Sequence, residues 1–151
     1  RIGEDTEAPF VFQAANLAAR IHGFYAKVYS GDKFGVSNIA TVIVGEQRAY
    51  NDSAHAIPGS IQAGHYDYYE GGSGQGITYA DASAANEGGF RPEEAADAVE
   101  VNGEGATIGW INGGEWLEYT VKVAQSGVYE LSFRYASGNA AGGGPFHLQL
   151  N

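Results

Sequence analysis

The sequence predicts an all-β fold, an antiparallel β-sandwich, from two observations. Apolar and polar residues alternate in three runs of the second half, "EWLEYTVKV", "GVYELSFRY" and "PFHLQLN", and this period of two is typical of strands with one buried face. The chain also contains 23 glycines and 13% aromatic residues. Short strands joined by tight turns have this composition, whereas disordered chains are poor in aromatic residues.

The first predicted strands lie near the N-terminus, at residues 10–14, 23–30 and 38–45, with a turn at 31–35 between the last two. The stretch that follows is polar and has no periodicity. Such a stretch between two periodic regions indicates a connection, so we expect a linker at 47–56.

The three alternating runs of the second half predict strands at 115–123, 127–135 and 145–151. In the first of them, Trp116 and Glu118 fall on the outward face and Leu117 and Tyr119 on the buried face. The full set of side chains expected in the core is Leu117, Tyr119, Val121, Val123, Tyr129, Leu131, Phe133, Tyr135, Phe146, Leu148 and Leu150. The glycine-rich segments between the runs are expected to form turns.

The charge balance disfavours several partners. Eight basic residues against 18 acidic ones give a formal net charge of −10, and binding to nucleic acid or to an anionic membrane needs a basic field. No apolar run approaches the length of a membrane span. The absence of cysteine excludes disulfides, thiolate metal sites and cysteine nucleophiles. Neutral or cationic partners are therefore favoured.

Four motifs carry a resemblance to a known family: "IPGSIQA", "NEGG" before an arginine, "GWINGGEWLEYTV" and "GVYELSFRYASG". With them, residues 57–151 resemble the N-terminal two thirds of a family 6 carbohydrate-binding module. The resemblance implies a jelly-roll β-sandwich that binds polysaccharide, catalyses nothing, and is attached to a secreted bacterial glycan-degrading enzyme. We therefore expect this module to be C-terminally incomplete in the chain.

Residues 1–46 are similar to the C-terminal half of a bacterial Ig-like domain, through a run that opens "GEDTEAPFVFQ". Arg20 and His22 stand where that family has glycine and tyrosine. Together the two resemblances imply a chain that begins inside one domain and ends inside another. They also imply a secreted or cell-surface bacterial protein.

Four residues are candidates for contact with sugar. Trp116 is outward by alternation, and an exposed tryptophan ring can stack on the C–H face of a pyranose; a covering loop is an equally good explanation from alternation alone. The position of Trp110 before a turn slightly favours core packing. The family resemblance instead implies that Trp110 and Glu100 line a loop cleft, and that Trp116 and Gln149 line a second cleft on the sheet face.

The resemblance also implies a structural calcium ion with oxygen ligands, one of them a glutamate. Gly64 stands at that glutamate's position, which argues against the ion. No catalytic pair is expected, because Glu115 and Glu118, three residues apart on a strand, point to opposite faces. The acids of "RPEEAAD", which are Glu93, Glu94 and Asp97, are expected in a solvated loop.

The leading hypothesis is therefore a non-catalytic polysaccharide-binding module. The alternative is a structural or adhesive extracellular protein that assembles through strand exchange, since incomplete sandwiches leave open strand edges. A weaker third hypothesis is a glycoside hydrolase whose catalytic residues lie outside the chain. The sequence does not specify the sugar.

Overall fold

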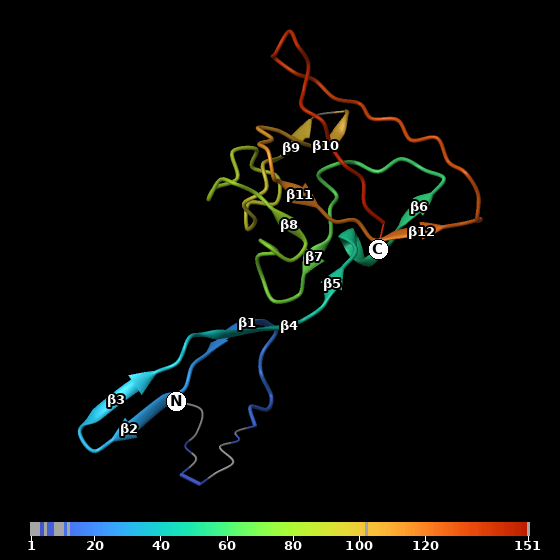
Figure 1. Cartoon of the computed structure of the whole chain (residues 1–151). Coiled ribbons are helices and arrows are strands. Elements are labelled where there is room, and N and C mark those ends of the chain that lie inside the picture. The colour runs from blue at the N-terminus through green and yellow to red at the C-terminus, as the bar shows by residue number, and fades with distance from the viewer. Residues whose placement is uncertain (1–3, 5, 8–10, 12, 102, 151) are drawn as a thin grey trace.

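The computed structural model describes residues 4, 6, 7, 11, 13–101 and 103–150. Within them the chain is nearly all β (Figure 1), which confirms the predicted fold class. The strands are β1 (Arg20–Phe24), β2 (Lys27–Ser30), β3 (Lys33–Val36), β4 (Ala40–Val44), β5 (Gln47–Arg48), β6 (His55–Ile57), β7 (Tyr68–Tyr69), β8 (Tyr79–Ala80), β9 (Ala98–Val101), β10 (Gly105–Ile108), β11 (Trp116–Leu117) and β12 (Val121–Val123). One short 3-10 turn, η1 (Tyr50–Asp52), accompanies them.

The N-terminal strands form two antiparallel pairs, β1 with β4 and β2 with β3. The β2–β3 hairpin closes through a two-residue loop of Gly31 and Asp32, because Ser30 pairs with Lys33. Gly31 has a φ of 58°, which suits a tight hairpin turn. The expected turn at 31–35 is therefore shorter in the structure, and Lys33–Gly35 belong to β3. Of the strand expected at 10–14, residues 10 and 12 lie outside the described residues, and the others form no strand.

The remaining pairs are β5 with β7, β8 with β11 and β9 with β10, all antiparallel, and β6 with β12, which is parallel. The β6–β12 pair therefore brings together two segments that are far apart in the sequence, as Figure 1 shows beside the C-terminus label. The stretch expected as a linker, 47–56, contains β5, η1 and the start of β6.

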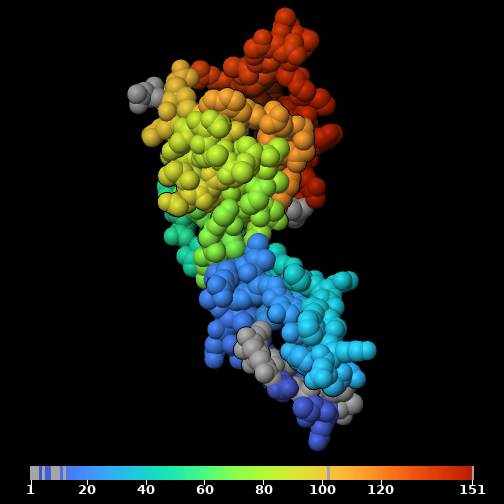
Figure 2. Space-filling model, turned by 90° about the vertical axis from the view of Figure 1, so that its left-hand side faces the viewer, coloured from blue at the N-terminus to red at the C-terminus, as the bar shows by residue number. Residues whose placement is uncertain are grey.

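The core lies between Gly64 and Ala106 in the sequence, since every buried residue that the structure describes falls in that range. Its centre is a cluster of Tyr66, Tyr79, Ala96 and Ala98. Phe90, Ala95, Ile108, Leu117 and Tyr119 pack around this cluster. Figure 2 shows these middle residues, green to orange, as one packed body, with the N-terminal hairpins extending from it.

The core predicted for the C-terminal runs is wrong. Residues 124–150 form no strand, and the apolar side chains of 127–150 are exposed. The exposed set comprises Tyr129, Leu131, Phe133, Tyr135, Phe146, Leu148 and Leu150. Val123 is also half-exposed, at 51%. Alternation shows only which side chains share a face that can be buried. Burial also requires a partner strand, and no described strand pairs with residues 124–150.

Candidate functional site

Trp116 lies on the outward side of β11, as alternation predicts. It pairs with Ala80 of β8, and the next residue, Leu117, pairs with Tyr79. Tyr79 is fully buried and Leu117 packs against the core cluster. Because successive side chains of a strand point to opposite faces, Trp116 is directed away from the core, and 39% of it is exposed.

Trp110 is also a surface residue, with 60% of its area exposed, so the core packing favoured by its position alone is wrong. The backbone leading into it is fixed, because Gly109 N donates to Asp97 O at 2.9 Å. Trp110 itself has a φ of 47°, in the left-handed region that only glycine and a few polar residues adopt readily. The Asn112 side-chain amide donates to Trp110 O at 3.0 Å and holds this conformation.

The turn between the two tryptophans is held by Glu115. One carboxylate oxygen, Oε2, accepts from Asn112 N at 2.8 Å, and the other, Oε1, accepts from Ala82 N at 3.1 Å and from Asn112 Nδ2 at 3.3 Å. Gly114 supplies the positive φ of the turn, at 96°. Sequence reasoning treated Glu115 only as a candidate acid. The signal it missed is the three-residue spacing from Asn112, at which a glutamate side chain can reach back to a backbone amide.

Glu100 and Gln149 lie on other segments. Glu100 is exposed on β9, opposite Ala106 of β10, and it is close enough to His65 to oppose the lowering of that imidazole's pKa, which comes mainly from burial. Gln149 is exposed in the C-terminal segment that forms no strand. The structure thus places the two tryptophans at the ends of one turn, with Glu100 on the strand pair that leads into it.

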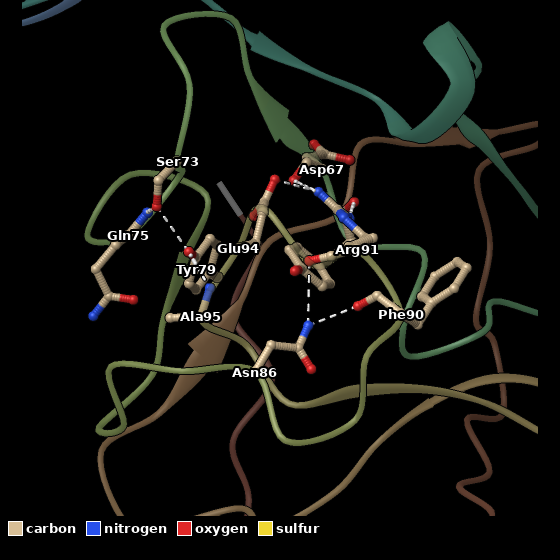
Figure 3. A network of polar contacts seen from close by, with 10 residues as sticks. Asp67, Ser73, Gln75, Tyr79, Asn86, Phe90, Arg91, Glu94 and Ala95 are labelled. Atoms are coloured by element: carbon tan, nitrogen blue, oxygen red, sulfur yellow. Dashed lines mark hydrogen bonds and ion pairs between the residues drawn. The ribbon is translucent and has the colours of Figure 1, made fainter.

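A second polar cluster surrounds Arg91, which is only 8% exposed. Its guanidinium donates to the backbone oxygens of Tyr66 and Asp67, the second at 3.1 Å, and pairs with Glu94 at 2.9 Å (Figure 3). The guanidinium carbon lies 3.6 Å from the ring centroid of Tyr66 and 3.9 Å from that of Tyr68. Cation–π contact and ion pairing therefore compensate the burial of this charge.

The acids near Arg91 correct the expected solvated loop. Glu93 is exposed, as expected. Glu94 and Asp97 are buried, at 6% and 3% exposed, because each has a partner that satisfies its charge. Glu94 pairs with Arg91, and Asp97 Oδ1 accepts from Glu87 N at 2.6 Å. Burial and the nearby Glu94 carboxylate raise the pKa of the Tyr66 phenol, so it stays protonated at neutral pH.

A pocket of about 530 Å³ opens beside this cluster, lined by Tyr68, Gly72, Ser73, Arg91, Glu93 and Glu94. Arg91 Nε is buried and has no hydrogen-bond partner, while the Glu94 carboxylate interacts with the Tyr66 hydroxyl. Ser73 Oγ lies 2.9 Å from the Tyr79 hydroxyl, which also accepts from Ala95 N. In Figure 3 the Glu94 side chain lies between this Ser73–Tyr79 pair and Arg91.

The backbone at Gly64 does not fit the glutamate ligand of the calcium site that the family resemblance implies. A Cβ atom at Gly64 would lie 2.7 Å from the Cβ of Ala106, so this backbone has no room for a glutamate side chain there. Among the residues that the structure describes, no group of three or more His, Asp or Glu side chains could hold a metal ion. In the same residues, no helix is both long and apolar enough to span a membrane.

Comparison with known proteins gives one family. No curated protein and no solved structure matches the chain. The Ig-like resemblance of residues 1–46 stays a prediction. The family match begins later than residue 57, where the resemblance seen in the sequence starts, and lies in the C-terminal part of the chain. It includes Glu100, Trp110, Trp116 and the Arg91–Glu94 pair. Residues 81–151 match the model of the carbohydrate binding module of family 6, which supports carbohydrate binding by a non-catalytic module.

Proposed function

We propose that residues 57–151 bind a neutral polysaccharide through Trp110 and Trp116, and that they do not cleave it. The observation that carries this proposal is the exposure of the two rings. Both tryptophans of the chain are exposed, at 60% and 39%, on either side of one fixed turn. Exposed large apolar rings mark binding surfaces, and a flat ring stacks on the C–H face of a sugar.

Two exposed polar side chains on other segments, Glu100 and Gln149, offer groups that suit the same ligand. The Glu100 carboxylate accepts hydrogen bonds from sugar hydroxyls, and such charge-assisted bonds are stronger than neutral ones. The Gln149 amide both donates and accepts. The net charge of −10 favours a neutral glycan over an acidic one. We assign the module to a secreted bacterial glycan-degrading enzyme, where it raises the effective concentration of the enzyme at its substrate.

The test is calorimetric titration of the whole chain with soluble xylan, laminarin, hydroxyethylcellulose and low-melting agarose. Trp116→Ala is expected to weaken binding to the preferred glycan by about 1–3 kcal/mol, the usual contribution of an aromatic stacking platform. The free energy of unfolding should fall by less, because the ring lies outside the core.

The matched control for this test is Tyr25→Ala, which removes another exposed ring, 62% accessible, from the N-terminal part. This control is expected to leave the affinity unchanged. Equal affinities for wild type and Trp116→Ala, together with a loss of several kcal/mol in stability, would contradict the proposal.

A second candidate function is assembly into larger extracellular structures. The observation in its favour is the row of exposed apolar side chains at alternate positions from Tyr129 to Tyr135, continued from Phe146 to Leu150. Extended, apolar and unpaired segments of this kind join readily to strands of another chain.

A further inference from the structure

The turn between the two tryptophans contains an asparagine followed by a glycine, Asn112 and Gly113, and both residues are exposed. The backbone N–H of Gly113 donates no hydrogen bond to any residue that the structure describes. A Cβ atom added to Gly113 would have no atom of another segment within 4 Å. The backbone nitrogen that follows the Asn112 side chain is therefore accessible and unengaged.

An asparagine followed by glycine can lose its side-chain amide without an enzyme, because glycine has no Cβ to hinder ring closure. The Gly113 nitrogen attacks Asn112 Cγ and forms a succinimide ring. The Cγ–Nδ2 bond breaks, and ammonia leaves with the proton of the Gly113 amide. Water then opens the ring. Attack at Cγ gives aspartate, and attack at the main-chain carbonyl carbon gives isoaspartate.

The amide that this reaction removes is the one that holds the turn. Asn112 Nδ2 donates to Trp110 O at 3.0 Å and to Glu115 Oε1 at 3.3 Å. Both hydrogen bonds lie at exposed positions, where water competes for the same groups and the net gain of each bond is modest. The side chain is therefore released for part of the time and can turn toward the Gly113 nitrogen.

The product has the opposite hydrogen-bonding character. A carboxylate only accepts hydrogen bonds, and at residue 112 it would face Trp110 O and the Glu115 carboxylate, so two attractive contacts become repulsive. Isoaspartate also adds a methylene group to the backbone of the turn. We propose that Asn112 is a site of spontaneous deamidation, and that the reaction opens the turn and releases Trp110 from its left-handed backbone conformation.

The buried residues that the structure describes all lie between Gly64 and Ala106 in the sequence, outside this turn. Deamidation should therefore leave the fold intact and change only the relation between the two tryptophan rings. The chain would then lose polysaccharide affinity as it ages, without cleavage or unfolding. This last consequence rests on the proposed function.

The experiment incubates the whole chain at mildly alkaline pH, because the attacking nitrogen reacts after it loses its proton. Digestion after glutamate releases residues 105–115, which contain Asn112 and exclude the other Asn–Gly pair at 102–103. Mass spectrometry is expected to show conversion of the Asn112 amide to an acid, and labelling by an isoaspartyl methyltransferase should detect isoaspartate in the same peptide. Intact Asn112, under conditions in which a synthetic peptide of residues 109–115 reacts, would overturn the proposal.

The chain supplies an internal control in Asn139, which is exposed and is followed by Ala140. Its amide should persist in the same samples, because the alanine Cβ hinders ring closure. Equal conversion of Asn139 and Asn112 would show general hydrolysis of amides and would also overturn the proposal.

Two variants connect the reaction to the turn. Gly113→Ala fits the open space at this position, where φ is not positive, and Asn112 should then react at least about tenfold more slowly. Asn112→Asp contains one reaction product from the start. Because both tryptophans flank the turn, fluorescence reports on it without a ligand. The wild-type spectrum should shift with age toward that of Asn112→Asp, and the Gly113→Ala spectrum should stay constant. A constant wild-type spectrum despite conversion would contradict the opening of the turn.

Titration of fresh and aged protein with the preferred glycan separates this inference from the proposed function. If both hold, aged wild type binds at least about threefold more weakly than fresh wild type, while aged Gly113→Ala keeps its affinity. If converted protein binds as tightly as fresh protein, the opening of the turn is overturned. If fresh protein binds no polysaccharide while conversion of Asn112 shifts the fluorescence, the modification site is supported and the proposed function fails.

Discussion

A tryptophan in the left-handed backbone region is costly at the scale of a single residue. Trp110 has a φ of 47°, and such a conformation in a bulky residue stores about 1–3 kcal/mol that the surroundings must compensate. The compensation is visible in two hydrogen bonds, one from Gly109 N to Asp97 O and one from the Asn112 side chain to Trp110 O. Trp110 combines a strained backbone with a side chain that is 60% exposed. This combination fits a residue placed for binding better than one placed for packing.

Trp110→Gly tests this assignment. Glycine adopts a positive φ without strain, and the lost ring buries little area, so the free energy of unfolding should change by less than about 1 kcal/mol. The affinity for the preferred glycan should fall by about 1–3 kcal/mol. Urea denaturation and calorimetric titration of the same samples measure both quantities. A destabilisation of about 3–5 kcal/mol, typical of a core aromatic residue, would show instead that Trp110 packs in the fold.

The sequence pattern predicted the outward direction of Trp116 but not the burial of Glu94. Alternation gave the direction of Trp116 because Leu117 beside it packs on the core, and the two must point to opposite faces. Alternation said nothing of Glu94, which lies in a segment without periodicity. Its burial depends on Arg91 and on the Tyr66 and Tyr68 rings against that guanidinium. Arg91 is only three residues from Glu94, but the two tyrosines that cover the guanidinium lie more than 20 residues away, so a local pattern predicted a solvated loop where the structure has a buried ion pair.

At the scale of an element, the turn from Ile111 to Glu115 determines how far apart the two tryptophan rings lie. The turn is tied to itself through Asn112 and to the loop at Ala82, in both cases by Glu115. A carboxylate can accept two or more hydrogen bonds at once. Glu115 thus holds the strand end at Trp116 and the loop at Trp110 in one arrangement, although it is not expected to touch the sugar.

Glu115→Ala should therefore reduce affinity without removing either ring. Three hydrogen bonds to exposed groups are lost, which should lower the free energy of unfolding by about 1–2 kcal/mol in total, because water replaces part of them. The affinity for a polysaccharide that spans both rings should fall. Glu115→Gln, which keeps one acceptor, should lie between the alanine variant and wild type. A folded Glu115→Ala protein with wild-type affinity would show that the turn does not position the rings.

The strands show what patterns can and cannot predict about elements. The run at 115–123 was predicted as one strand, and it holds two short ones, β11 and β12, with residues 118–120 outside any strand. Their partners were not predictable, because β12 pairs in parallel with β6, inside the expected linker and module start. The runs at 127–135 and 145–151 have the same alternation, and their described residues form no strand. A period of two encodes which side chains share a face, and the pairing of that face is decided by contacts between distant segments.

At the scale of the whole molecule, burial is concentrated in Gly64–Ala106 and apolar surface in the flanks. Two opposing terms decide whether these flanks associate. The net charge of −10 repels a second copy, but salt screens this repulsion beyond about 8 Å at physiological ionic strength. Burying about 400 Å² of apolar surface contributes about 10 kcal/mol, which is of the same order as the roughly 4–15 kcal/mol that association costs. The balance favours weak association that depends on concentration.

Multi-angle light scattering of the chain over a range of concentrations measures this balance. The average mass should rise with concentration and rise further when salt is added, because salt removes the repulsion. Leu131→Glu with Leu148→Glu places charges among the exposed apolar side chains and should abolish the rise. Ser132→Glu with His147→Glu adds the same two carboxylates at neighbouring exposed positions of the opposite alternation phase, and should reduce it less. A constant monomer mass in every protein and at every salt concentration would exclude assembly through the C-terminal segment and leave glycan binding as the remaining function.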